Sequence, residues 1–123
     1  MERIDIDDPE FEMDTSERWT YQGSVYSGEA VEYGPNGQIV GLTTLKDGLE
    51  DGPQKAWYAD GTRDSEGVSR RGKAVGEWRE WHPNGQLKAI RLFDERGNHL
   101  STQEWEPDGT PVERPRHSSR PPG

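Results

Sequence analysis

The fold of this chain is decided by GEWREWHPNGQL, residues 76–87, where a glycine, two tryptophans and an Asn-Gly pair follow at short intervals. The second tryptophan of that stretch belongs to a set of four aromatic residues placed 24 residues apart: Tyr33, Trp57, Trp81 and Trp105. Each is followed four residues later by a glycine, which Asn or Asp precedes. A fixed period of this length indicates stacked units that bury a surface only against their neighbours. The chain is therefore predicted to be an array of repeats.

Each repeat reads as a β-hairpin. The Asn-Gly or Asp-Gly pairs are expected to supply the positive φ angles of tight turns, with strands such as 78–81 before the turn and 86–93 after it. A second turn, at Gly48 and Gly72, joins one hairpin to the next, and in the third copy Gly97 stands one residue late. Glycine and proline recur too often for a continuous helix. The predicted fold is all-β, a curved antiparallel meander of repeated β-hairpins.

Two features of the repeats carry further expectations. The periodic aromatic residues are expected to form a ladder of neighbours on paired strands. Residues 63–66, Arg-Asp-Ser-Glu, stand where an aliphatic strand is expected, so the second repeat is predicted to present a polar face or an irregular strand. Pro111 follows the last turn and is expected to end the sheet, because proline has no N–H for the ladder.

Three segments are predicted along the chain. Residues 1–17 form an acidic N-terminal cap or arm, since terminal repeats need a polar outer face. Residues 18–113 form the repeat domain. Residues 114–123 are basic and proline-rich, which predicts a flexible, disordered C-terminal tail.

The composition bounds the class of partner. The net charge is −9 and the mean hydropathy −1.17. An acidic body repels the phosphates of nucleic acid and anionic lipid, so neither nucleic acid nor a membrane is expected as a partner. There is no cysteine for a disulfide or a thiolate metal site. Residues 1–5 show no secretory signal pattern, and a cytoplasmic protein is expected.

Residues 76–87 resemble the bacterial MORN-variant repeat, a glycine and two aromatic residues followed by Asn-Gly and an aliphatic residue. Residues 49–61 and 26–33 are similar, and the resemblance extends over about 18–113. Small bacterial proteins with such repeats are described as antitoxins of toxin–antitoxin systems. The resemblance therefore implies a neutralising or immunity role with a protein partner, a toxin among the possibilities. It implies no catalytic residues.

The candidate partner-binding residues are Trp78, Tyr58, Trp57 and Trp81. The first two are not demanded by the repeat, because Ala30, Gln54 and Thr102 occupy the places equivalent to Trp78, and Gly34, His82 and Glu106 those equivalent to Tyr58. Tryptophan and tyrosine are enriched at binding hot spots. Trp57 and Trp81 belong to the periodic set, for which structural packing is the alternative interpretation.

The remaining polar patterns are weaker. The acidic run at residues 5–17 is a candidate mimic of phosphate that would steer a basic partner, or simply a solvated segment. It lacks the spacing of a calcium loop. His82, His99 and His117 show no metal-ligand spacing, and neither a metal nor another cofactor is expected.

The sequence thus favours a non-enzymatic protein-binding module, an antitoxin or immunity-type inhibitor that occludes its partner. Two alternatives remain open. One is a scaffold that recruits a peptide or a second copy at an exposed sheet edge, as a monomer or an edge-paired dimer. The other is a small-molecule enzyme with a site on the sheet face, although no catalytic motif is present.

Overall fold

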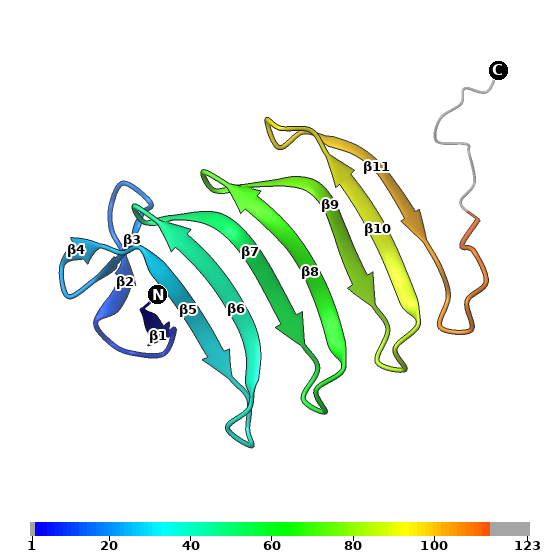
Figure 1. The fold of residues 1–123 in the computed structure, drawn as a ribbon, viewed down its shortest axis with the longest axis horizontal. Coiled ribbons are helices and arrows are strands. Elements are labelled where there is room, and N and C mark those ends of the chain that lie inside the picture. Colours follow the sequence, from blue (N-terminus) through cyan, green and yellow to red (C-terminus); the bar gives the residue numbers. More distant parts are fainter. Residues whose placement is uncertain (1, 114–123) are drawn as a thin grey trace.

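The computed structural model describes residues 2–113 and contains eleven strands and no helix in that range (Figure 1). The strands are β1 (Arg3–Asp5), β2 (Phe11–Met13), β3 (Trp19–Tyr21), β4 (Ser24–Val25), β5 (Gly28–Tyr33), β6 (Ile39–Lys46), β7 (Leu49–Trp57), β8 (Arg63–Arg70), β9 (Lys73–Trp81), β10 (Leu87–Phe93) and β11 (His99–Glu104). Eight of them form one sheet in the order β1-β5-β6-β7-β8-β9-β10-β11, and β2, β3 and β4 form a second. The predicted all-β meander is confirmed. The predicted tail at 114–123 lies outside the described residues.

Four turns at one end of the strands of the large sheet share a single geometry. Their glycines, Gly37, Gly61, Gly85 and Gly109, have φ between 82° and 93°. The preceding Asn or Asp does not have a positive φ, so this part of the turn prediction is wrong. Its side chain acts instead as an acceptor: Asp60 Oδ1 accepts from Thr62 N at 2.9 Å, and the equivalents of Asp60 in the next two turns do the same. A three-residue loop of this kind, closed by the bond from Tyr58 N to Thr62 O, needs one left-handed residue, whereas the two-residue loops described next have two.

The two-residue turns lie at the opposite end of the strands. In Asp47–Gly48 and Arg71–Gly72 both residues have positive φ, from 51° to 84°. Each of these glycines also donates to a carbonyl two strands earlier, Gly48 N to Tyr26 O just before β5 at 2.9 Å and Gly72 N to Glu50 O at the start of β7 at 2.7 Å. The third connection uses the longer turn, closed by Gly97 N to Asp94 O at 3.0 Å. The late position of that glycine is therefore a change of turn type.

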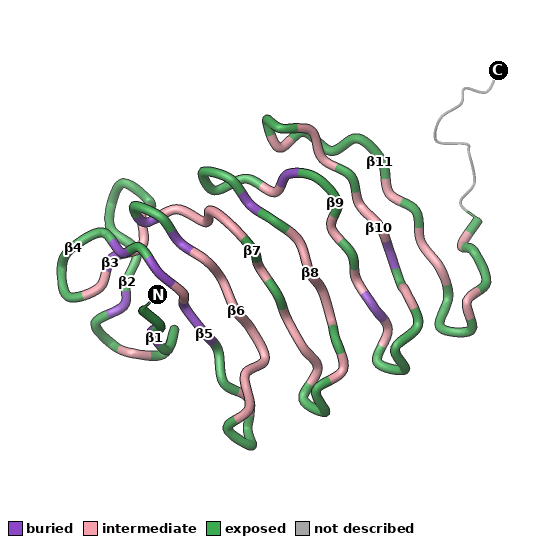
Figure 2. Tube along the Cα trace, viewed as in Figure 1, coloured by how far each residue is buried: buried purple, intermediate pink, exposed green. Residues whose placement is uncertain are grey.

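The main buried cluster lies at the N-terminal end of the sheet. β1 pairs in parallel with β5, and the β2-β3-β4 sheet packs beside it. The cluster consists of Ile4, Phe11, Tyr26, Ala30 and Leu45, with Trp19 and Tyr21 packed against it. The boundary predicted after residue 17 falls between β2 and β3, which pair with one another. Beyond this end the sheet is a single layer, mostly half-buried or exposed (Figure 2).

The strand register defines two faces of that layer. Residues directly opposite one another on adjacent strands lie on the same face. One face carries the row Val31, Leu42, Lys55, Glu66, Arg79 and Ile90, and two residues further along β5, β7 and β9 it carries Tyr33, Trp57 and Trp81. We call it the Trp81 face. The other, the Trp78 face, carries the rows Ala30, Thr43, Gln54 and Gly67, and Trp78, Arg91 and Thr102.

The expected ladder of adjacent aromatic residues is wrong. Each repeat contributes two strands, so the periodic aromatics fall on every second strand, about 10 Å apart at the usual strand spacing. Their direct neighbours are instead Ile39, Arg63 and Leu87. Within residues 2–113 the ring contacts involve other residues. The periodic aromatics therefore pack against the intervening strands.

The two departures from the repeat have different outcomes. Residues 63–66 begin β8, a strand of eight residues, so the second repeat has the polar face that was one of the two expectations. At the C-terminal end β11 is the last strand, and Trp105 and Pro111 form only an isolated bridge, in keeping with the expected effect of that proline.

Candidate functional site

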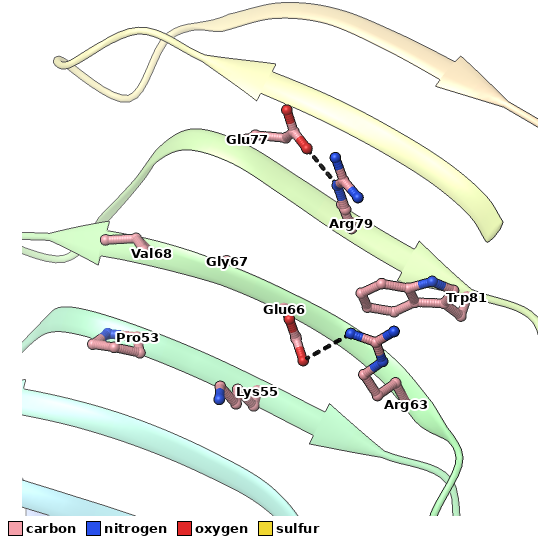
Figure 3. Close-up of a pocket in the computed structure, with 9 residues that line it drawn as sticks. All are labelled: Pro53, Lys55, Arg63, Glu66, Gly67, Val68, Glu77, Arg79 and Trp81. Carbon is pink, nitrogen blue, oxygen red and sulfur yellow. Dashed lines mark hydrogen bonds and ion pairs between the residues drawn. The ribbon is translucent and has the colours of Figure 1, made fainter. Parts of the chain in front are cut away.

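A groove crosses β7, β8 and β9 on the Trp81 face, with a cavity volume of about 440 Å³ (Figure 3). It is lined by Pro53, Lys55, Arg63, Glu66, Gly67, Val68, Glu77, Arg79 and Trp81. Three cations and two carboxylates from three neighbouring strands converge here, so the groove carries a net positive charge within a chain of net charge −9. It is therefore a local exception to the charge of the molecule.

Arg63 and Trp81 form the centre of the groove. The guanidinium carbon of Arg63 lies 4.4 Å from the centroid of the Trp81 ring, within the range of a cation–π contact. Arg63 Nη1 also lies 3.7 Å from Glu66 Oε2. Trp81 is only 8% exposed, and the arginine covers one side of its ring. Arg63 is thus held by a flat surface on one side and by a carboxylate on another.

The other charged residues of the groove differ in how far they are neutralised. Glu66 faces Lys55 on β7 and Arg79 on β9 in the strand register. Arg79 pairs closely with Glu77 on its own strand. Lys55 is exposed and makes no ion pair with any described residue. Its ammonium is therefore the most available charge in the groove.

Trp78, on the opposite face, lies flat against the backbone of β8. A Cβ atom placed on Gly67 would stand 2.0 Å from Cδ2 of the Trp78 ring, so only glycine leaves room for the indole. The indole Nε1 donates to Val68 O at 3.0 Å. The register of β8 and β9 shifts between Glu66 and Val68, at the same place. Trp78 therefore covers an irregular stretch of the sheet.

An ion-pair network lies beside Trp78 on that face. Arg91 Nε donates to Glu80 Oε2 at 2.8 Å, and its Nη2 lies 3.9 Å from Glu104 Oε2. The hydrogen bond to Glu80 raises the pKa of the Arg91 guanidinium above its ordinary value, with both carboxylates contributing. The charges of this face are thus largely satisfied by one another.

The residues that follow Trp57 and Trp81 link successive repeats. Tyr58 Oη donates to Trp81 O at 2.6 Å, and His82 Nε2 lies 2.7 Å from Trp105 O. Burial, followed by the nearby carboxylates of Asp64 and Glu80, raises the pKa of the Tyr58 hydroxyl. A tyrosine and a histidine place a polar atom at the far end of a ring, which is why this shared role is hidden in the sequence. Tyr58 thus has a structural partner.

Part of the acidic N-terminal run stabilises turns through side-chain hydrogen bonds. Asp5, Asp8 and Asp14 each accept a hydrogen bond from the backbone N–H two residues later, at 2.8–2.9 Å. Such side-chain-to-backbone bonds are the usual way in which aspartate shapes a turn. The backbone N–H of Arg18 contributes most to lowering the pKa of Asp14. Three of the acidic side chains therefore have a local structural role.

Comparison with protein families assigns one stretch of the chain. The family model described as MORN repeat variant matches residues 74–95. Residues 74–95 are a MORN repeat variant. No curated protein and no solved structure matches the chain. The MORN repeat variant comprises most of β9, the turn after it and all of β10.

The four predicted partner-binding residues do not form one surface. The MORN repeat variant places Trp78 and Trp81 on opposite faces. Trp57 lies on the Trp81 face of the preceding repeat, and Tyr58 follows it at the start of a turn. Lys55, Arg63, Glu66 and Arg79, which line the groove, were not among the predicted residues. For Arg63 and Glu66 the signal was the polar departure at residues 63–66, whereas no sequence pattern pointed to Lys55 or Arg79.

Within residues 2–113 no three His, Asp or Glu side chains are grouped as metal ligands would be. No helix in that range is long and apolar enough to span a membrane.

Proposed function

We propose that the chain is a non-enzymatic protein-binding module whose partner docks on the Trp81 face. The groove across β7, β8 and β9 carries this proposal, because it presents an aromatic–guanidinium stack and an exposed lysine on an open layer. Aromatic residues and arginine supply most of the binding energy at protein interfaces. We therefore assign direct contact to the stacked pair of Arg63 and Trp81, and we place Trp57, whose neighbour across the strands is Arg63, beside the docking surface. The MORN repeat variant is consistent with a repeat-built binding module of this kind.

Trp78 and Tyr58 receive a supporting part in this proposal. Their polar atoms bond to Val68 O and Trp81 O, both in strands that line the groove. Replacing either side chain would then remove a hydrogen bond to a strand that lines the groove and so alter the shape of the groove. Loss of binding in such a variant would report a change of the sheet as well as a lost contact.

The more specific form of the proposal is an antitoxin or immunity-type inhibitor acting in the cytoplasm. Its support is the resemblance of residues 76–87 to the repeats of bacterial antitoxins. In this form the partner is a toxin, and docking on the Trp81 face occludes the surface that makes it toxic. The test is expression of the captured partner alone and together with this chain. Growth arrest by the partner, relieved by the wild-type chain and not by the groove variant described below, is the expected result.

A second candidate, a scaffold that pairs through its sheet edge, is favoured by β11. This last strand contains no lysine, arginine or proline, and Leu100 is 62% exposed. Lysine, arginine and proline protect many edge strands from pairing with another chain, so β11 lacks this protection. A peptide or a second copy of the chain could then add a strand beside β11.

One experiment separates the two candidates. The tagged chain is used for affinity capture with mass spectrometry, beside Val68→Glu in the groove and Leu100→Glu on β11. Both side chains are exposed, so both variants should keep the fold. We expect one protein to be retained by the wild type and by Leu100→Glu but lost by Val68→Glu. Loss with Leu100→Glu alone would favour the edge, and no specific protein at all would overturn the binding proposal.

A further inference from the structure

We infer that the groove on the Trp81 face recognises a carboxylate side chain in an acidic segment of the partner protein. Arg63 is the principal receptor, and Lys55 is the second cation. The inference rests on the proposed binding function and adds the chemistry of the partner. It comes from comparing the second repeat with its neighbours.

The charges of the groove are not demanded by the repeat. Arg63 occupies the place of Ile39 in the first repeat and Leu87 in the third. Likewise the pair Lys55 and Glu66 occupies the place of Val31 and Leu42, which lie directly opposite one another on β5 and β6. Aliphatic residues therefore satisfy the same positions elsewhere in this sheet. In the second repeat alone both positions of that pair are charged, which points to a role other than packing.

The geometry of Arg63 suits a carboxylate. A guanidinium has five N–H donors arranged as a rigid fork, and carboxylates accept from it in a bidentate manner. The guanidinium is fixed by the Trp81 ring at 4.4 Å and by Glu66 at 3.7 Å, yet it donates no hydrogen bond of ordinary length to a described residue. A receptor that is already fixed loses less conformational entropy on binding. Arg63 is therefore both oriented and available.

The charge balance favours an incoming anion at this place. Glu77 is engaged by Arg79, and Glu66 lies 3.7 Å from Arg63, so neither carboxylate is paired with Lys55. An additional carboxylate would complete the pairing of Arg63 and of the exposed Lys55. The acidic remainder of the chain repels such a segment only over about 8 Å at physiological ionic strength. The segment is therefore held in the groove and disfavoured elsewhere on the molecule.

The far end of the groove defines a second requirement. Pro53 and Val68 lie directly opposite one another on β7 and β8, and Val68 is 42% exposed (Figure 3). They offer a small apolar surface a short distance from the Arg63 and Trp81 pair. A partner segment that combines acidic residues with an adjacent leucine matches both parts. The inferred ligand is thus an acidic peptide segment with an aliphatic residue.

The test is a titration of the ¹⁵N-labelled full chain, followed by NMR at the Nε–H of Arg63 and the indole N–H of Trp81. The probe is an acetylated and amidated Leu-Glu-Glu-Leu peptide, and its uncharged counterpart is Leu-Gln-Gln-Leu. We expect saturable shifts at both N–H groups with the acidic peptide. The Gln peptide should bind about tenfold more weakly or worse, as expected from the loss of a charge-assisted hydrogen bond.

The decisive variant is Arg63→Leu, which introduces the residue type of the neighbouring repeats and should keep the amide spectrum of the fold. It is expected to abolish the Trp81 shift. Arg70→Leu, at the far end of β8 and outside the groove, is the matched control and should bind as the wild type does. Absence of a shift at Arg63, equal shifts with the Gln peptide, or unchanged binding by Arg63→Leu would each overturn the inference. A captured partner lost by Val68→Glu but retained by Arg63→Leu would overturn it while leaving the binding function intact.

Discussion

At the scale of single residues, close contacts between side chain and backbone replace the core that the layer lacks. The clearest is Trp78 on Gly67, where the ring occupies the space that any Cβ atom would need. Gly67 stands in the middle of β8, between the glycine positions that the turns explain. Its identity follows from the shape of a neighbouring strand. A single sequence read for turns has no means of finding it.

Gly67→Ala should lower the free energy of unfolding by about 1–3 kcal/mol, because the added methyl group displaces the indole and its hydrogen bond to Val68 O. Chemical denaturation measures the change. The same substitution in a Trp78→Ala background should cost much less, since the clash is then absent. Equal costs in the two backgrounds would show that the ring does not limit residue 67.

Tyr58→Phe should cost about 0.5–1.5 kcal/mol, the usual worth of one hydrogen bond, because the bond to Trp81 O links two repeats. Tyr33→Phe is the matched control, since Tyr33 is 43% exposed and its hydroxyl has no hydrogen-bond partner among the described residues. Thermal denaturation of both variants makes the comparison. Indistinguishable melting temperatures would contradict the linking role of Tyr58.

At the scale of elements, the sequence reveals the hairpins better than the turns and the site. The period of Trp57 and Trp81 was sufficient to predict strand pairs and their order, because every repeat closes on the same turn glycine. The same period led to the wrong prediction of an aromatic ladder, because a repeat of two strands places the equivalent aromatic residues on every second strand. The groove was not predicted, because Arg63 packs on Trp81, and Lys55 lines the same groove, only through cross-strand packing and the register of three strands.

The repeated turns also predict a response to acid. The backbone N–H of Thr62 lowers the pKa of Asp60, and the hydroxyl of Thr110 is the largest cause of lowering at Asp108. A carboxyl whose pKa is lower in the folded state stabilises the fold above its ordinary pKa, near 3.9, and loses this contribution as the pH falls through the folded value. Stability should therefore fall on acidification below about pH 4.

The double variant Asp60→Asn and Asp108→Asn should be less sensitive to that acidification. Asparagine occupies the equivalent places at Asn36 and Asn84, and it keeps an acceptor oxygen without a titrating proton. The measurement is the free energy of unfolding at pH 7 and at successive lower pH values. An equally steep fall in the wild type and the variant would contradict the role given to these two carboxyls.

At the scale of the whole molecule, the N-terminal end, where the two sheets pack together, stabilises a long single-layered sheet. The cluster around Phe11 and Tyr26 buries apolar side chains between the small sheet and the first strands of the large one. The remaining strands depend on their neighbours, as in other repeat architectures. Both faces of that layer are therefore accessible, and the Trp81 face carries the groove.

A variant that lacks residues 1–27 should unfold at a lower temperature and associate with increasing concentration. The deletion removes most of the buried cluster, uncovers Ala30 and Leu45, and leaves the edge of β5 without β1. Sedimentation velocity over a range of concentrations measures the association. Phe11→Ala is the control, since it weakens packing but keeps β1, and it should remain monomeric. A truncated chain that stays monomeric and equally stable would contradict this role of the N-terminal strands.

The Trp81 face as the binding surface is tested most directly by the tryptophan indole N–H resonances of the ¹⁵N-labelled chain during titration with the captured partner. We predict that the indole signals of Trp57 and Trp81 shift or broaden first, while that of Trp78, bonded to Val68 O on the opposite face, changes least. Changes confined to Trp78, with Trp57 and Trp81 unaffected, would place the partner on the other face and contradict the proposed docking surface.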